Sequence, residues 1–237
     1  MAQRQPFAAL NMQAGTTHDL PGDAFRLLSD QVAYLKLSGV QAAQAASYVE
    51  RSKSTRGLII DLRNYPSEFV PFALGALLVD QPTPFARFTA GDLDNPGAFL
   101  WRGAPLMLTP QQPHYSGKVV VLVDEVTLSQ AEYTTMAFRA SPRTVVVGST
   151  TAGADGNVSQ IMLPGGLRTM ISGIGVFFPD KRPTQRIGIV PDIEVRPTIA
   201  GIRAGRDEVL EAALRQILGI DVPADQIEKM ARPAPSQ

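Results

Sequence analysis

Hydrophobic and polar positions change from a two-residue period to a helical period several times along the chain. Residues 32–37 are mostly apolar and predict a strand in which Lys36 shares a face with Tyr34. Residues 41–53 are rich in Ala and lack Gly and Pro, which favours a helix. The run GLIIDLRN, 57–64, is continuously apolar and then turns polar, as is typical of a buried parallel strand.

The same order of elements continues toward the C-terminus, with one interruption. Residues 81–117 are rich in Pro, Gly and aromatic residues and predict an ordered excursion with one or two short strands. Two strands joined at a Pro-Gly-Gly turn are expected over 159–179. Further elements are expected as a helix at 68–81, a strand at 118–125, a helix at 129–141, a strand at 144–153, a further segment at 186–195 and an amphipathic helix at 205–219.

This alternation of strands and helices predicts a layered α/β domain with a mostly parallel sheet flanked by helices. We expect a lead-in extension over 1–24, the α/β core over 25–219 and a partly disordered C-terminal tail over 220–237. The three apolar strands all end in polar residues, and functional groups gather at the carboxyl ends of parallel strands. The polar ends are Asp61-Leu62-Arg63-Asn64, Asp124-Glu125 and Gly148-Ser149-Thr150-Thr151.

Composition excludes several classes of function. The 237 residues are 44% hydrophobic and 19% charged with zero formal net charge, so no basic surplus exists to neutralise the phosphates of a nucleic acid. The chain has no Cys and two His far apart, and it lacks calcium-loop and nucleotide-binding motifs, so neither a metal nor a cofactor is expected. No run of about 18 apolar residues predicts a membrane span. The first residues lack the apolar core of a secretory signal.

Ser129 stands between a predicted strand end and a predicted helix start. With Glu132 three residues on, it fits a capping box, in which the hydroxyl and the carboxylate bond to free N–H groups of the first turn. The same position would expose the Ser129 hydroxyl at the rim of the sheet, where the N–H of Gln130 could stabilise an oxyanion. The motif is compatible with both interpretations.

Five sequence blocks resemble the tail-specific, or C-terminal-processing, serine protease family of the Clp-protease/crotonase superfamily. They are GLIIDLRNYPSEF, VVVLVDEVTLSQAE, VVVGSTTAGADGNV, LPGG and RIGIVPDIEV, and the resemblance covers about residues 26 to 218. It implies a Clp-protease/crotonase-like fold, here without a PDZ domain, and a serine endopeptidase acting on extended polypeptides. The block T-L-S-Q-A-E makes Ser129 the nucleophile and Glu132 its supporting carboxylate by resemblance. Family members are commonly exported to the periplasm or cell envelope.

The general base is where the chain departs from the family. The lysine that follows the third strand in the commoner subfamily is replaced by Ala154 or Asp155, and Asp155 is interpreted as a turn residue. A second branch resembles the tricorn core protease and takes a histidine from the early strand, where this chain has Lys36. A buried lysine can act as a base, although Lys36 could equally extend its ammonium to water. Gln185 falls near the orienting Glu of that branch.

The two histidines and the second oxyanion donor complete the candidates. His114 precedes the strand that Ser129 follows, so the two should lie about 17 Å apart, and the path of His18 cannot be derived. The family's oxyanion Gly-Gly is replaced by Ser67 and Glu68, whose backbone N–H groups would serve as donors. Glu68 would bring a negative charge close to the oxyanion.

Three functions therefore remain open. The first is a serine peptidase. The second is a catalytically impaired module that binds a peptide or a partner, which the missing lysine and the substituted glycines favour. The third is an acyl-thioester enzyme of the crotonase type, which the order of the blocks disfavours.

Overall fold

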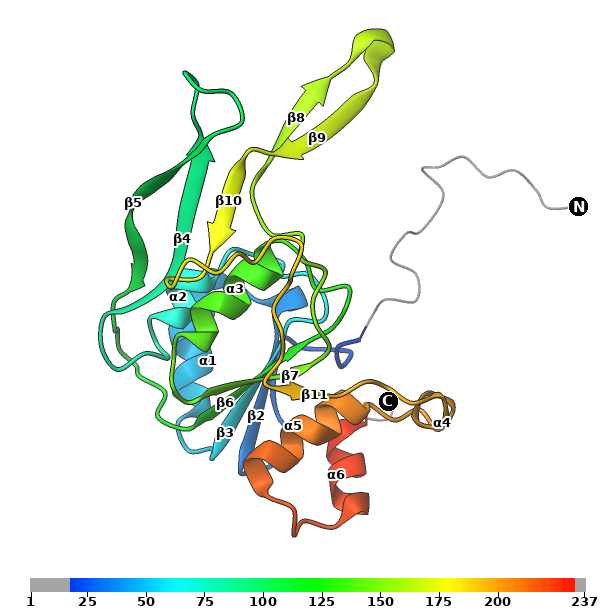
Figure 1. The fold of residues 1–237 in the computed structure, drawn as a ribbon. Helices are drawn as coiled ribbons and strands as arrows, with labels where there is room; N and C mark the ends of the chain where they lie inside the picture. Colours follow the sequence, from blue (N-terminus) through cyan, green and yellow to red (C-terminus); the bar gives the residue numbers. More distant parts are fainter. Residues whose placement is uncertain (1–17, 233–237) are drawn as a thin grey trace, which may run out of the picture.

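A six-stranded sheet forms the centre of the molecule in a computed structural model that describes residues 18–232 (Figure 1). Its strand order is β1-β2-β3-β6-β7-β11, with β1 antiparallel to β2 and every other pair parallel. The strands are β1 (Phe25–Leu27), β2 (Val32–Lys36), β3 (Gly57–Asp61), β6 (Lys118–Val123), β7 (Thr144–Gly148) and β11 (Ile193–Glu194). The predicted mostly parallel α/β architecture is confirmed.

Helices cover both faces of this sheet because its buried strands are apolar on both faces. On one face, α1 (Ala45–Ser52), α2 (Pro71–Gly75) and α3 (Gln130–Arg139) close the larger core. On the other face, α5 (Glu208–Leu218) packs on β3, β6 and β7, and α6 (Ala224–Ala231) packs on α5. A short helix, α4 (Ile199–Arg203), precedes α5. The side-chain alternation of each strand therefore decides which layer its residues contact.

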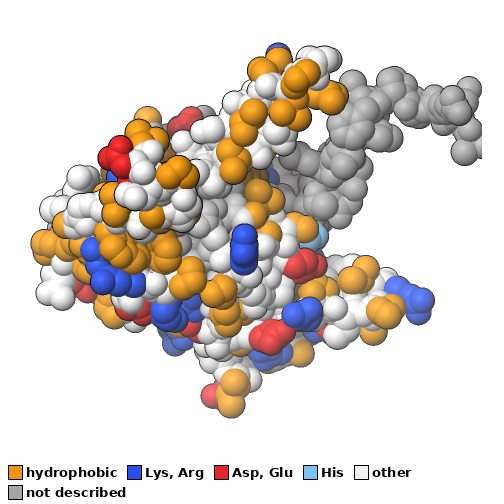
Figure 2. All heavy atoms as spheres, turned by 45° about the horizontal axis from the view of Figure 1, so that its top comes forward, with side chains coloured by type: hydrophobic (Ala, Val, Ile, Leu, Met, Phe, Trp, Pro, Cys, Tyr) orange, Lys and Arg blue, Asp and Glu red, His pale blue; other side chains and the backbone are white. Residues whose placement is uncertain are grey.

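A second, antiparallel layer stands beside α3. It has the order β10-β4-β5, with β4 (Thr83–Gly91), β5 (Phe99–Leu108) and β10 (Ile174–Phe177). The excursion over 81–117 thus contains two long strands rather than short ones. Strands β8 (Val158–Met162) and β9 (Arg168–Ser172) form a projecting hairpin that ends in the Pro-Gly-Gly turn (Figure 1). Figure 2 shows apolar side chains on this hairpin. Met162, Leu167 and Met170 are among its exposed residues.

The core extends beyond the limits expected from the sequence. Leu20, in the predicted lead-in, is buried with the α5 side of the core. Helix α6 lies in the predicted C-terminal tail, yet its Ile227 and Ala231 are buried. The packed structure therefore continues past residue 219. Most of the segment ARPAPSQ, expected to be disordered, lies outside the described residues.

Candidate active site

The turn between β6 and α3 is built by hydrogen bonds of Asp124 and Thr127. Asp124 Oδ1 accepts the N–H groups of Val126 and Thr127 at 3.1 and 3.0 Å, which closes a tight turn directly after the strand. The Thr127 hydroxyl accepts the N–H of Asp124 and contacts the carbonyl of Leu62 on the neighbouring strand end. These polar residues therefore hold the junction in shape, and Ser129 follows at its outer end.

Ser129 adopts a backbone conformation that side chains normally avoid. Its φ is 55° and its ψ is −121°, and α3 begins at the next residue. Such a conformation costs of the order of 1–3 kcal/mol for a residue with a Cβ and occurs preferentially at functional sites. A nucleophilic serine on a strained strand-to-helix turn is a recurring arrangement in hydrolases. Ser129 is half-buried and lines a cavity, so its hydroxyl is not enclosed in the core.

Glu132 joins this turn to the loop that follows β7. Its side chain is fully buried and its Oε2 accepts the N–H of Ser129 at 3.0 Å, which is the carboxylate half of the predicted capping box. Its two oxygens also accept the N–H groups of Gly153 at 2.8 Å and Ala154 at 2.9 Å, and the hydroxyl of Thr151. One buried carboxylate therefore fixes the Ser129 turn and residues 151–154 against each other.

Gly153 makes the close approach of this loop possible. Its φ is +66°, and a Cβ at this position would meet the backbone of residues 186–188 at 3.0 Å. Glycine adopts such a conformation without steric cost. The glycine in TTAGADG is thus required by the fold of the loop beside Ser129.

The expected oxyanion donors divide into two groups. The N–H of Gln130 is the first of α3 and, like the other N–H groups of a first helical turn, has no acceptor within the helix. Ser67 does not fit the expectation, because its N–H donates to the carbonyl of Leu37 at 2.9 Å and its hydroxyl donates to Val40 O at 2.6 Å. Its N–H is therefore unavailable to a substrate, which corrects the prediction for Ser67.

Glu68 lies beside Gln130 and directs its charge elsewhere. The amide Nε2 of Gln130 donates to the carbonyl of Glu68 at 2.7 Å, which brings the segment after β3 to the start of α3. The carboxylate of Glu68 accepts the N–H of Ala42 at 2.7 Å. Within residues 18–232, no hydrogen-bond acceptor is found for the N–H of Glu68. The Glu68 carboxylate is therefore bonded to the segment before α1, whereas the sequence suggested that it would lie close to the oxyanion.

A cavity of about 460 Å³, called the Ser129 pocket here, opens at the start of α3. Its apolar wall comes largely from aromatic rings, with Phe69 and Phe88 each 5.9 Å from the ring of Tyr133. Its polar wall comes from the α3 junction and from the loop after β7. The lining residues are Tyr65, Phe69, Phe88, Ser129, Gln130, Tyr133, Asp155, Gly156, Asn157, Val158, Ile174 and Val176.

Lys36 does not reach this pocket. Its Nζ donates to the carbonyl of Leu20 at 2.8 Å and lies 3.8 Å from a carboxylate oxygen of Asp19. Tyr34, two positions earlier in β2, contacts the α5 side of the core, whereas α3 covers the opposite face. Alternation along the strand therefore directs Lys36 away from Ser129, which corrects its expected role as general base.

Neither histidine lines the Ser129 pocket. His114 lies before β6, where it pairs with Asp80 at 2.9 Å. His18 bonds through Nδ1 to Asp124, and this hydrogen bond raises the pKa of the imidazole. His18 belongs to a different cavity, described below.

Gln185 positions the loop around Asp155 instead of orienting a base. Its Nε2 donates to the carbonyls of Asp155 at 3.0 Å and Ile174 at 2.9 Å, and its Oε1 accepts the N–H of Val176. It therefore ties the Asp155 loop to β10. Gln185 was expected to orient the general base, but its side chain bonds to neither Lys36 nor a histidine.

Asp155 is buried in the wall of the Ser129 pocket, although the sequence suggested only a turn residue. It is 5% exposed, lines the Ser129 pocket and accepts the N–H of Gly156 at 2.7 Å. Burial, reinforced by the charge of Glu132, raises the pKa of its carboxyl to about 7. In the sequence, the only indication of a special role for Asp155 is that an acidic residue stands near the position of the family lysine. The same residue, placed between two glycines, is equally compatible with a turn.

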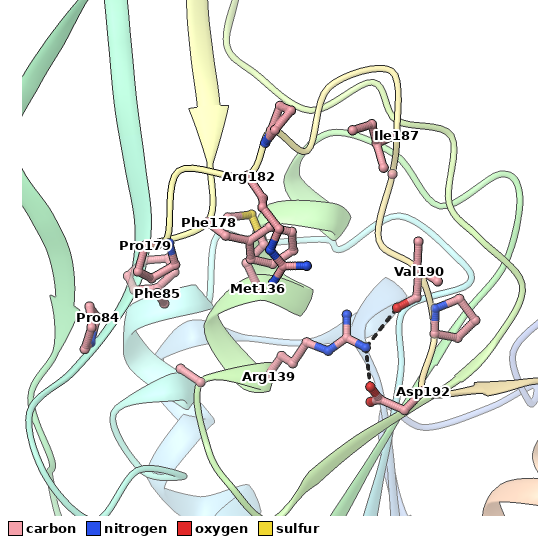
Figure 3. A pocket seen from close by; sticks show the side chains of 14 residues that line it. Pro84, Phe85, Met136, Arg139, Phe178, Pro179, Arg182, Ile187, Val190 and Asp192 are labelled. Carbon is pink, nitrogen blue, oxygen red and sulfur yellow. Dashed lines mark hydrogen bonds and ion pairs between the residues drawn. The ribbon is translucent and has the colours of Figure 1, made fainter.

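Two further cavities share no lining residue with the Ser129 pocket. One, of about 660 Å³, is bounded by Phe85, Met136 and Phe178, and in it Arg139 pairs with Asp192 and donates to the carbonyl of Val190 (Figure 3). The other, of about 390 Å³, is called the Arg63 pocket here and lies at the carboxyl ends of β3, β6 and β7. Its lining residues are His18, Arg63, Val123, Asp124, Glu125, Ser149, Val195, Pro197, Ile202, Arg206, Asp207 and Val209.

Metal and membrane sites find no support in the part of the chain that the structure describes. No cluster of three or more His, Asp or Glu side chains there is arranged to hold an ion. No helix among these residues has the length and apolar character needed to cross a bilayer.

Comparison with known proteins identifies the family. The model of peptidase family S41 matches residues 31–195, which is most of the chain. The chain belongs to peptidase family S41. Its membership indicates a peptidase and confirms the resemblance to tail-specific proteases. No curated protein matches the chain.

Solved structures share the fold of this S41 chain at low sequence identity. A protein described as a peptidase from Parabacteroides merdae ATCC 43184 is 23% identical with a TM-score of 0.74, over 87% of this chain and 69% of that one. Mature CPAF is 18% identical with a TM-score of 0.62, over 81% and 53%. The photosystem II D1 C-terminal processing protease is 21% identical with a TM-score of 0.58, over 89% and 50%. The chain spans about half the length of the last two.

Proposed function

We propose that this chain is a serine-type peptidase that hydrolyses extended polypeptides with Ser129 as nucleophile. The observation that carries the proposal is the strained backbone of Ser129 at the mouth of a cavity and at the first turn of α3. The N–H of Gln130 lies next in the chain, and the Gln130 side chain donates to the carbonyl of Glu68, which joins the backbone at Glu68 to the start of α3. Two N–H donors beside a serine hydroxyl suit the oxyanion of a tetrahedral intermediate.

The lining of the Ser129 pocket supports a preference in the substrate. Tyr65, Phe69, Phe88 and Tyr133 supply aromatic surface. In the part of the chain that the structure describes, neither Lys nor Arg lines the pocket. An apolar or aromatic side chain next to the scissile bond would gain hydrophobic contact there. We therefore expect faster cleavage after Phe or Leu than after Asp or Lys in otherwise identical fluorogenic peptides.

A fluorophosphonate probe, which phosphonylates activated serines, tests the proposal. The wild-type chain should be labelled on Ser129 and should cleave fluorescein-labelled casein, and Ser129→Ala should lose both activities. Ser54→Ala is the matched control, because Ser54 is exposed and lies outside the lining of the pocket. Labelling and cleavage that persist in Ser129→Ala contradict the assignment of the nucleophile.

A catalytically impaired peptide-binding module is the second candidate. The observation that favours it is that, within residues 18–232, neither Lys nor His lines the Ser129 pocket. In that case the wild-type chain binds labelled unfolded casein in fluorescence anisotropy, yet the probe labels no serine and the casein stays intact. The two candidates therefore give opposite results with one probe.

The cellular location of the protein stays a prediction. The resemblance to tail-specific proteases suggests export to the periplasm or cell envelope. Fractionation of the producing cells, followed by immunodetection of the chain, checks this: recovery in the envelope or periplasmic fraction supports export, and recovery with cytoplasmic markers contradicts it.

A further inference from the structure

The Ser129 pocket contains a nucleophile without the bases that usually accompany one. Of the five lysines, Lys36 and Lys53 engage Asp19 and Glu50, Lys118 donates to the carbonyl of Gln216, and none lines the pocket. Its titratable lining residues, within residues 18–232, are Tyr65, Tyr133 and Asp155. Burial raises the pKa of Tyr133 well above its ordinary value, which makes its phenolate inaccessible near neutral pH.

Asp155 and Ser129 line the same pocket because the fold joins the two chain segments that carry them. Glu132 accepts the N–H groups of both Ser129 and Ala154, so the two chain segments that end in Ser129 and Asp155 meet at one carboxylate. Gln185 fixes the carbonyl of Asp155, and Gly156 donates to its Oδ1. The Asp155 side chain is therefore positioned in the wall of the pocket that Ser129 also lines.

Among the residues that the structure describes, no cation is bonded to Asp155. From α3 it faces Glu132 and Tyr133, and from the segment before β11 it faces the hydroxyl of Thr184, 3.4 Å from its Oδ2. Arg186 shares a neighbouring cavity wall with Asp155, but it is not among the groups that shift the pKa of Asp155. A buried carboxylate with no counter-ion binds a proton far more readily than an exposed one.

We propose that Asp155 is the general base that deprotonates Ser129. This inference rests on the proposed function. The Ser129 hydroxyl proton passes to a carboxylate oxygen of Asp155 as Oγ forms a bond to the scissile carbonyl carbon. The carbonyl π electrons move to oxygen, where the N–H groups of Gln130 and Glu68 hold the anion. When the intermediate collapses, the C–N bond breaks and Asp155 returns the proton to the leaving amine.

The remaining half-reaction uses the same groups in reverse order. The Asp155 carboxylate takes a proton from a water molecule that attacks the acyl carbon of the Ser129 ester. Collapse of the second intermediate breaks the bond to Oγ, and the proton on Asp155 returns to Ser129. A base with a pKa of about 7 is suited to both transfers near neutral pH, since it exists in comparable amounts in both protonation states.

The rate of Ser129 labelling by the fluorophosphonate probe, measured as a function of pH, tests this role. In the wild-type chain the rate should rise with pH through an inflection near pH 7, as Asp155 ionises. Asp155→Asn keeps the shape and an acceptor oxygen for Gly156 but cannot take a proton. We expect it to lower the rate by about 10²–10⁴-fold and to abolish the inflection. Asp94→Asn, at an exposed position on the β4–β5 loop, should leave rate and profile unchanged.

The outcomes separate this inference from the proposed function. A wild-type chain that is not labelled at any pH overturns the peptidase proposal itself. Labelling of wild type and Asp155→Asn at equal rates with the same pH profile leaves the nucleophile in place and overturns the role of Asp155. Should circular dichroism show that Asp155→Asn is unfolded, the wild-type profile decides: a rate that is flat between about pH 5.5 and pH 8.5 rejects Asp155 as the base.

Discussion

The Ser129 pocket and the Arg63 pocket both lie where parallel strands end, yet they differ in whether their buried charges are paired with opposite charges. In the Arg63 pocket, Arg63 bonds to both oxygens of Asp61 and both oxygens of Asp207 at 2.7–3.0 Å. In the Ser129 pocket, Asp155 is also buried, but within residues 18–232 no cation pairs with it. A compensated cluster stabilises the fold, whereas an uncompensated carboxylate retains a proton affinity that chemistry can use.

Removal of the central cation should be the most damaging single change. Arg63 is 5% exposed and joins the end of β3 to Asp207, whose side chain also caps α5 through the N–H of Leu210. Arg63→Met leaves the fully buried Asp61 without a counter-ion, and such a loss typically costs about 3–5 kcal/mol. Urea unfolding should show this decrease in the free energy of unfolding.

The matched control for that change is Arg182→Met, because Arg182 forms its ion pair with Asp180 at the surface. An exposed pair contributes about 0–1 kcal/mol. Similar losses for the two variants would mean that the Arg63 cluster is not a compensated buried network, and the contrast between the pockets would disappear.

The second prediction concerns the effect of pH on stability through Asp155. Its pKa in the folded chain is raised from 3.8 to about 7, so the folded state binds the proton more tightly than the unfolded state. Stability contributed by this group is therefore fully present below about pH 4 and is lost as the pH rises to about 7. The loss over this window is on the order of 4 kcal/mol.

Comparison of wild type with Asp155→Asn isolates this term. The difference in free energy of unfolding between the two, measured by urea at several pH values, should move in favour of the variant between about pH 4 and pH 7 and then level off. A difference that does not vary with pH contradicts the raised pKa and, with it, the uncompensated burial of the carboxylate.

The third prediction addresses the carboxylate that joins the two halves of the Ser129 pocket. Glu132→Gln retains one acceptor oxygen but replaces the other with an amide N, which cannot accept the N–H groups that Oε2 now binds. Loss of buried hydrogen bonds should reduce stability by about 1–3 kcal/mol. Because the Ser129 turn and the Asp155 loop lose their common anchor, fluorophosphonate labelling should fall more than stability does. Labelling at the wild-type rate would show that Glu132 does not position the site.

The sequence was sufficient for the layers and for the position of Ser129 at a strand-to-helix junction, but not for the surroundings of Lys36 and Asp155. Continuous apolar runs such as 57–61 and 118–123 specify buried parallel strands, and the polar residues after them mark the edge that carries the site. The surroundings of Lys36 could not be predicted from the sequence, because they depend on which face of the sheet its side chain lies on. That face is decided by the strand register and by which helices cover each face of the sheet. The environment of Asp155 depends on Glu132 and Gln185, which are distant in sequence, and no local pattern encodes such burial.

The smallest expected effect separates the hydroxyl of Ser129 from its backbone strain. Ser129→Ala and Ser129→Gly both remove Oγ, so both should abolish labelling, but only glycine adopts φ of 55° without steric cost. We therefore expect Ser129→Gly to be more stable than Ser129→Ala by about 1–2 kcal/mol in urea unfolding. Equal stabilities would mean that the junction stores no strain at this residue. A more stable glycine variant would instead indicate that the chain retains an unfavourable conformation to present a hydroxyl, in contrast to the Arg63 pocket, where the buried charges compensate one another.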